Sequence, residues 1–193
     1  MRLPEVERGE ALRSRMLIGF ISAISGYRLP DAARVAFYHR DFVGRIFGGW
    51  TQSAMRGPSE WSVGERELMA AMVAEWNSNR FCRGAHRAVA VLGLEPATVD
   101  SCLADYHAAA ISEQLRATLT FLEAMTRHPD MLDASHVREA MASGVSREQL
   151  TDAVAVATVF NVITRYADAL DFVVPSEAEL ARAAGMLLKR GYG

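Results

Sequence analysis

Helical periodicity along nearly the whole chain is the feature that most constrains its fold. Apolar residues recur three and four positions apart, and the alternating pattern of half-buried strands is almost absent. Ala, Leu, Met, Glu and Arg, which favour helices, are abundant. The chain has 193 residues, half of them apolar, which is enough for a buried core without disulfides. The sequence therefore predicts an all-α, multi-helix protein.

We expect one domain over residues 1–193, because no low-complexity linker interrupts the pattern. Gly-Pro, His-Pro and Val-Pro steps mark connections between helices. The expected parts are N-terminal helices at 1–58, a motif-bearing repeat at 59–94, connecting helices at 95–143, a second repeat at 144–172, and a C-terminal helix at 173–193.

The motif-bearing segment has a second, degenerate copy. Residues 63–86 resemble residues 145–168 at a constant offset of 82, and Asn79 matches Asn161. This similarity predicts an internal duplication of a helix–turn–helix unit, with a turn at each asparagine. The titratable residues occur only in the first copy, where Cys82, His86 and Glu67 stand opposite Thr164, Asp168 and Gln149. Any site is therefore expected in the first copy.

Charge and cysteine content bear on partners and compartment. The net charge is −2 and no block of one sign occurs, which argues against a nucleic-acid partner. The longest N-terminal apolar run, 16–27, is about half a membrane span and lacks the pattern of a signal peptide. Two cysteines, Cys82 and Cys102, are too few for a disulfide framework. We expect a cytoplasmic protein with reduced thiols and no membrane partner.

The stretch NSNRFCRGAH, residues 77–86, carries the candidate chemistry. Cys82 and His86 are four residues apart, so they share a helix face. If Asn79 is the N-cap, its side chain accepts a hydrogen bond from the Cys82 backbone N–H. A helix N-terminus and a nearby imidazolium both lower a thiol pKa. The spacing predicts a reactive thiolate.

Glu67 is the third candidate, fifteen residues before the cysteine on the preceding helix. In an antiparallel helix pair it can relay a proton through His86, whereas Glu65 is expected to face another way. Two other interpretations stay open. Cys82 is an ordinary buried cysteine in one of them, and Cys, His and Glu hold a zinc ion in the other.

The pattern GERELMAAMVAEWNSNRFCRGAH resembles the signature of the AhpD-like superfamily. That group comprises alkylhydroperoxidases, carboxymuconolactone decarboxylases and peroxidase-related proteins, and its signature is a glutamate followed by C-x-x-C-x-x-x-H. The segment FNVITRYADAL resembles the second-half motif, so the resemblance covers about residues 30–171. It implies an AhpD-like multi-helix bundle that forms homo-oligomers, as dimers, trimers or hexamers.

The resemblance assigns roles residue by residue. Cys82 matches the peroxidatic cysteine, His86 the motif histidine, and Glu67 the glutamate of the proton relay. Phe81 stands where some members have histidine or tyrosine. Asn79 replaces the first, resolving cysteine.

These matches imply an alkylhydroperoxidase-like enzyme, which is a thiol-dependent peroxidase with an antioxidant role. It would be an oxidoreductase of the peroxiredoxin type, in a one-cysteine variant that lacks the resolving cysteine. A sulfenic acid on Cys82 then needs an external thiol reductant, or Cys102, to be reduced. The expected substrate is a small-molecule peroxide. No cofactor and no metal are expected.

Two alternatives differ in class. One is a carboxymuconolactone-decarboxylase-like enzyme, in which His86 and Glu67 supply acid–base catalysis and nearby arginines bind a carboxylate. The other is a non-catalytic helical oligomer with a decayed site, whose apolar stretches are buried between subunits. The candidate arginines are Arg80, Arg83 and Arg87, and the apolar stretches are MLIGFISAI and the series Phe42, Ile46, Phe47 and Trp50.

Overall fold

The computed structural model describes residues 1–9, 11–25, 28–38 and 40–192, and within these ranges it contains helices and no strand. The predicted all-α fold is confirmed. The helices are α1 (Pro4–Arg8), α2 (Leu12–Ser25), α3 (Asp31–Tyr38), the π-helix η1 (Arg40–Phe47), α4 (Gly48–Arg56), α5 (Val63–Trp76), α6 (Arg80–Ala90), α7 (Pro96–Asp105), α8 (Glu113–Arg127), the short 3-10 helix η2 (Pro129–Met131), α9 (Ala134–Ala142), α10 (Arg147–Ala169) and α11 (Glu177–Arg190).

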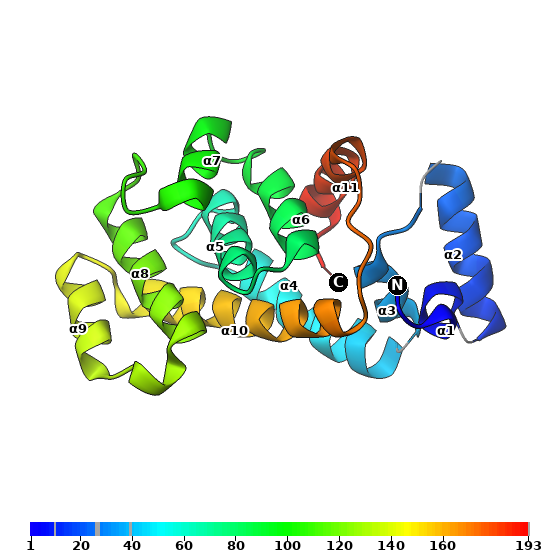
Figure 1. The fold of residues 1–193 in the computed structure, drawn as a ribbon, viewed down its shortest axis with the longest axis horizontal. Helices are drawn as coiled ribbons and strands as arrows, with labels where there is room; N and C mark the ends of the chain where they lie inside the picture. The colour runs from blue at the N-terminus through cyan, green and yellow to red at the C-terminus, as the bar shows by residue number, and fades with distance from the viewer. Residues whose placement is uncertain (10, 26–27, 39, 193) are drawn as a thin grey trace.

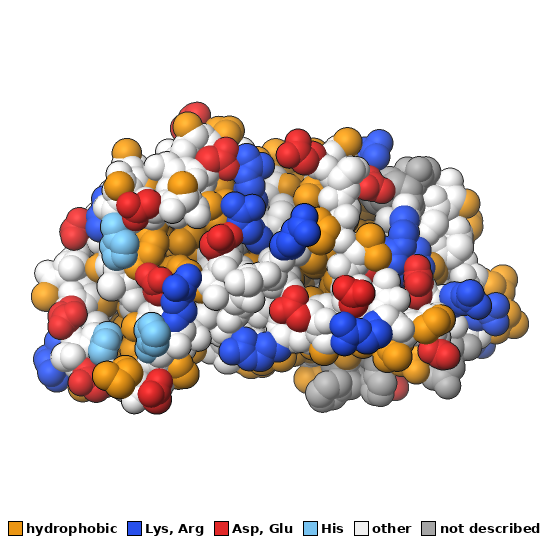
Figure 2. Space-filling view, viewed as in Figure 1, with side chains coloured by type: hydrophobic (Ala, Val, Ile, Leu, Met, Phe, Trp, Pro, Cys, Tyr) orange, Lys and Arg blue, Asp and Glu red, His pale blue; other side chains and the backbone are white. Residues whose placement is uncertain are grey.

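The helices surround a central pair formed by α5 and α6. The long helix α10 runs beside that pair, with α7, α8 and α9 towards one end and α1 to α3 at the other (Figure 1). α11 packs on the opposite side of α6. Acidic and basic side chains are interspersed on the face shown in Figure 2. No helix in the described ranges is long and apolar enough to cross a membrane.

α5 is the most buried helix of the fold. Ser62 caps its start, because the Ser62 hydroxyl accepts from the Glu65 N–H at 3.2 Å and Glu65 Oε2 accepts from the Ser62 N–H at 2.8 Å. Every residue from Arg66 to Ala74 is buried. Apart from Arg66 and Glu67 this stretch is apolar, so the helix forms part of the core on all sides. A glutamate in such a helix needs polar partners from its neighbours.

A tight connection joins α5 to α6. Ser78 takes a left-handed conformation, with φ of 58°, and the Asn79 N–H donates to the Ala74 carbonyl at 2.8 Å. Asn79 is the N-cap of α6, as predicted. The connection therefore places the start of α6 against the end of α5.

The second copy does not contain the predicted turn. Residues 147–169 form one continuous helix, and Asn161 lies within it. The Asn161 side chain contacts the Thr126 hydroxyl and the Asn77 amide instead of capping a helix. The two capped helix starts, Ser62 and Ser146, are 84 residues apart (146 − 62), not 82. The predicted turn at Asn161 is therefore wrong, because this segment continues as one helix through that residue.

Candidate functional site

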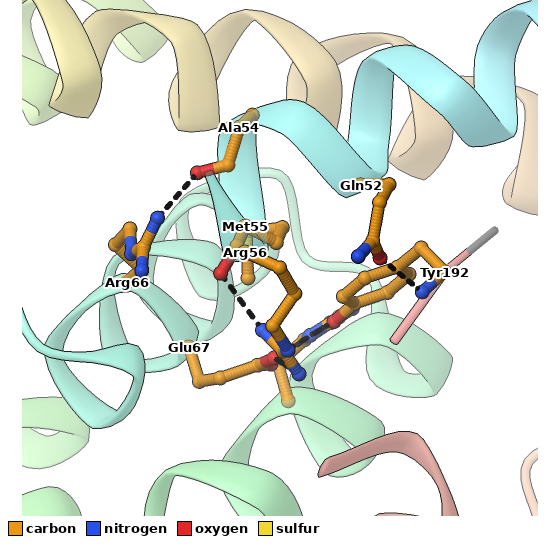
Figure 3. Close-up of polar contacts among 8 residues, drawn as sticks. Gln52, Ala54, Met55, Arg56, Arg66, Glu67 and Tyr192 are labelled. Atoms are coloured by element: carbon orange, nitrogen blue, oxygen red, sulfur yellow. Dashed lines mark hydrogen bonds and ion pairs between the residues drawn. The ribbon is translucent and has the colours of Figure 1, made fainter. Parts of the chain in front are cut away.

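Glu67 is the centre of a buried polar cluster. Its side chain is fully buried, and its carboxylate lies within hydrogen-bond distance of three side chains from three other segments. Arg56 Nη2 donates to Oε1 at 2.7 Å, the Tyr192 hydroxyl donates to Oε1 at 2.9 Å, and His86 Nδ1 lies 2.7 Å from Oε2. Figure 3 shows Arg56 and the Tyr192 ring converging on Glu67. The predicted pairing of Glu67 with His86 is present in the structure.

The charge state of Glu67 follows from these contacts. Burial by itself raises the pKa of the Glu67 carboxyl, but the hydrogen bond and charge of His86, together with the charge of Arg56, outweigh it and hold the pKa below its usual value. Glu67 is therefore a carboxylate. An ionised Oε2 at 2.7 Å requires the hydrogen on His86 Nδ1.

His86 presents its other nitrogen away from Glu67. The ring packs edge-on against Phe160 at 4.3 Å between centroids. Nε2 has no hydrogen-bond partner among the described residues, and the side chain is 7% exposed. When the ring is neutral, the contact with Glu67 favours the tautomer with its hydrogen on Nδ1, and Nε2 then carries the lone pair available for acid–base chemistry.

Cys82 lies in an apolar environment. Its thiol is 1% exposed and belongs to a cluster with Val6 of α1, Val35 of α3 and Phe172 after α10. Asn79 Oδ1 accepts from the Cys82 N–H at 2.8 Å, so the predicted cap is confirmed. Burial and, to a smaller extent, the charge of the Asp168 carboxylate nevertheless raise the pKa of the Cys82 thiol to about 12.

The predicted stabilised thiolate is therefore wrong for this conformation. Apolar side chains of the N-terminal helices exclude water from Cys82, and they outweigh the helix terminus. Within the described part of the chain, the Cys82 sulfur has no hydrogen bond to His86. Cys102 lies in α7 and is also buried in the core. The two cysteines are both free thiols.

Asn79 and Phe81 have structural roles. Besides capping α6, the Asn79 amide donates to Asp168 Oδ1 at 2.6 Å and to the Thr164 carbonyl at 3.2 Å. These bonds tie the start of α6 to α10. The Phe81 ring packs edge-on against Phe172 at 5.1 Å.

The three arginines of α6 do not line this cluster. Arg83 pairs with Glu75, and Arg87 pairs with Asp100 at 2.6 Å. Arg80 is exposed. The carboxylate-binding role considered for them therefore has no support in the structure.

Sequence reasoning missed two members of the site. Arg56 ends α4, and Tyr192 follows α11. The available signal for Tyr192 is its position directly after Gly191, whose φ of 71° lets the chain turn inward. In the described residues, no three His, Cys, Asp or Glu side chains gather as a metal site.

Solved structures share this architecture. An uncharacterized peroxidase-related protein from Silicibacter sp. TM1040 superposes with a TM-score of 0.73 at 22% identity, covering 86% of each chain. An uncharacterized peroxidase-related protein from Ralstonia eutropha JMP134, described as an alkylhydroperoxidase AhpD core, gives 0.74 at 21% identity, covering 93% of this chain and 94% of that one. The chain has the AhpD-like fold.

The AhpD-like fold also occurs in an enzyme of another stated activity. The debrominase Bmp8, as a cysteine-to-alanine variant in complex with 2,3,4-tribromopyrrole, superposes with a TM-score of 0.70 at 17% identity, covering 92% of this chain and 91% of that one. No protein-family model matches the sequence, and no curated protein matches it. At these identities the likeness concerns the fold, and the chemistry must be argued from the site.

Proposed function

We propose that the protein is an AhpD-like enzyme in which His86 catalyses proton transfer to and from a neutral carbon acid, which is the acid–base part of the carboxymuconolactone-decarboxylase-like alternative. The observation that carries this proposal is the 2.7 Å contact between His86 Nδ1 and the buried Glu67 carboxylate, which leaves Nε2 free. This arrangement is the one a general base requires, because a fixed tautomer directs the lone pair to the substrate.

The reaction follows from the charges of the pair. His86 Nε2 takes a proton from the substrate, and the imidazolium that forms is stabilised by the Glu67 carboxylate. The same nitrogen then returns the proton to the product. Arg56 keeps Glu67 ionised through its 2.7 Å ion pair, so it acts as a positioning residue. Since no uncommitted arginine lines the described cluster, the expected substrate is neutral at the reacting end.

A thiol-dependent peroxidase is the second candidate, favoured by the Asn79 cap on the Cys82 N–H. In that reaction the Cys82 thiolate attacks a peroxide oxygen, the O–O bond breaks, and His86 supplies the proton to the leaving alcohol. The product is a Cys82 sulfenic acid, which two equivalents of an external thiol reduce to the thiol, forming water and an external disulfide. The raised pKa of the Cys82 thiol places this candidate second.

Four variants separate the candidates. His86→Gln is compared with His128→Gln, an exposed histidine, and Cys82→Ser is compared with Cys102→Ser, a buried cysteine outside the cluster. Each protein is assayed with a panel of neutral lactones and C–H acids, following solvent deuterium incorporation, and with cumene hydroperoxide plus dithiothreitol.

The acid–base proposal predicts turnover in the first panel that falls about 100- to 10,000-fold in His86→Gln and is retained in the other three variants. Peroxide turnover that disappears in Cys82→Ser and persists in Cys102→Ser supports the second candidate instead. Turnover of the first panel that is unchanged in His86→Gln contradicts the proposal.

A further inference from the structure

The segment after α11 turns back into the cluster around Glu67. The Tyr192 N–H donates to Gln52 Oε1 at 2.6 Å, and the Tyr192 carbonyl oxygen lies against Gly48, where an added Cβ would stand 3.2 Å from it. The hydrogen bond to Gln52 ties the tail to α4 (Figure 3). Gly191 has φ of 71°, and a Cβ there would lie 2.3 Å from Gln52 Oε1, so a side chain at this position would strain the backbone and displace the Gln52 amide.

The Tyr192 ring fills a slot whose lining includes a cation and an imidazole. The Arg56 guanidinium carbon lies 5.0 Å from the ring centroid, within the range of a cation–π contact. The His86 ring lies nearly parallel to it, with centroids 6.2 Å apart and planes 20° apart. The Arg56 guanidinium and the His86 imidazole are therefore both neighbours of the Tyr192 ring.

The hydroxyl of the same ring meets the acid–base pair. It donates to Glu67 Oε1 at 2.9 Å, and its oxygen lies 3.3 Å from His86 Nδ1. Burial and the Glu67 charge raise the pKa of Tyr192 well above its ordinary value, so the phenol is a neutral donor. A carboxylate in the same position would face Glu67 and be repelled.

We propose that the slot filled by the Tyr192 side chain is a binding site for a neutral phenol, an aromatic ring with one hydroxyl, and that Tyr192 is its exchangeable intramolecular occupant. The proposal rests on the proposed function, because it names a ligand for Glu67, the carboxylate that holds His86 Nδ1. The ligand's ring lies on Arg56 and its hydroxyl donates to Glu67. Binding requires the Tyr192 side chain to leave the slot. The apparent affinity of the intact chain is therefore the affinity of the open slot multiplied by the fraction of chains in which Tyr192 has left it.

The test uses 4-methylphenol, which is the tyrosine side chain cut at Cβ, and toluene, which lacks the hydroxyl. Binding is measured by calorimetry to the intact chain and to Tyr192→Ala. The ring signals of Tyr192, assigned by their absence in Tyr192→Phe, are followed by NMR in the intact chain. The matched control is Tyr106→Ala, which removes another buried tyrosine whose hydroxyl donates to a glutamate, Glu123, at 2.6 Å.

We expect 4-methylphenol to bind the intact chain saturably and to move the Tyr192 signals towards those of an exposed tyrosine, while the Tyr106 signals stay in place. Tyr192→Ala should bind at least tenfold more tightly than the intact chain, and it should prefer 4-methylphenol to toluene at least tenfold. Adding Glu67→Gln should abolish that preference.

Binding of 4-methylphenol to folded Tyr192→Ala with no displacement of Tyr192 in the intact chain overturns the proposal, because any vacated tyrosine cavity, including that of Tyr106→Ala, can accept the ring. Equal binding of toluene overturns it as well. These readouts need no turnover, so they are independent of the activity test. If phenol displaces Tyr192 but turnover is unchanged by His86→Gln, the phenol site is supported and the proposed acid–base role of His86 is contradicted.

Discussion

At the residue scale, Glu67 and His86 form a buried hydrogen-bonded pair, and Cys82 lies in an apolar cluster. Glu67 and His86 were predicted together because helix spacing and antiparallel pairing place them on facing surfaces, and they lie 2.7 Å apart. The direction of the Cys82 pKa shift was predicted wrongly. Spacing along α6 reveals the helix terminus, whereas the burying residues, Val6 and Val35, come from a distant part of the chain.

The thiol environment gives the first prediction. In a Cys102→Ser background, the rate of Cys82 alkylation should stay low through neutral pH and rise only towards the thiol pKa of about 12, because burial disfavours the thiolate. The measurement is the alkylation rate of the folded protein against pH. An inflection well below the free-cysteine value of about 8.5 would contradict the structure and restore the peroxidase candidate to first place.

At the element scale, features that depend on residues close together in sequence, such as helix caps, can be predicted from the sequence. The cap at Asn79, predicted from residues three positions apart, forms, and the capping boxes at Ser62 and Ser146 have the same local spacing. The turn predicted at Asn161 failed because its side chain finds partners on α5 and α8, which local sequence does not show. Tyr192 was missed for the same reason, since its partners lie more than a hundred residues away in sequence.

The connection between α5 and α6 gives the second prediction. Ser78 has φ of 58°, a conformation that costs a non-glycine residue roughly 1–2 kcal/mol. Ser78→Gly should raise the free energy of unfolding by about 0.5–1 kcal/mol after the entropy cost of glycine is counted. Chemical denaturation measures it. The control is Ser143→Gly, at a helix end where φ is −82°, which should give no gain. Destabilisation by Ser78→Gly would contradict the conformation described here.

At the scale of the whole molecule, the fold was predictable and its assembly remains a prediction. The all-α architecture follows from the helical periodicity of the sequence. The AhpD-like resemblance rests on a motif that keeps its spacing although Asn79 replaces its first cysteine. The expectations of a single domain and of a homo-oligomer are still open. An exposed apolar stripe on α2 bears on the second of them, formed by Leu12, Met16, Phe20 and Ile24, each more than 60% exposed.

That stripe gives the third prediction. Its residues recur every four positions, so they form one helix face, and burying such a face between chains is favourable. Light scattering should give a mass above that of one chain, and the double change Phe20→Glu with Ile24→Glu should lower it. Met131→Glu, at an equally exposed apolar residue elsewhere, should leave the mass unchanged. A monomeric intact chain would contradict this prediction.

The tautomer of His86 tests the central claim most directly. Nitrogen-15 NMR of the imidazole at alkaline pH, where the ring is neutral, distinguishes a hydrogen on Nδ1 from one on Nε2, with His128 as the exposed reference. The structure predicts that His86 carries its hydrogen on Nδ1, held by Glu67, and that this preference is lost in Glu67→Gln. A His86 ring protonated on Nε2 in the intact chain would contradict it, because the nitrogen that must accept the substrate's proton would already hold one.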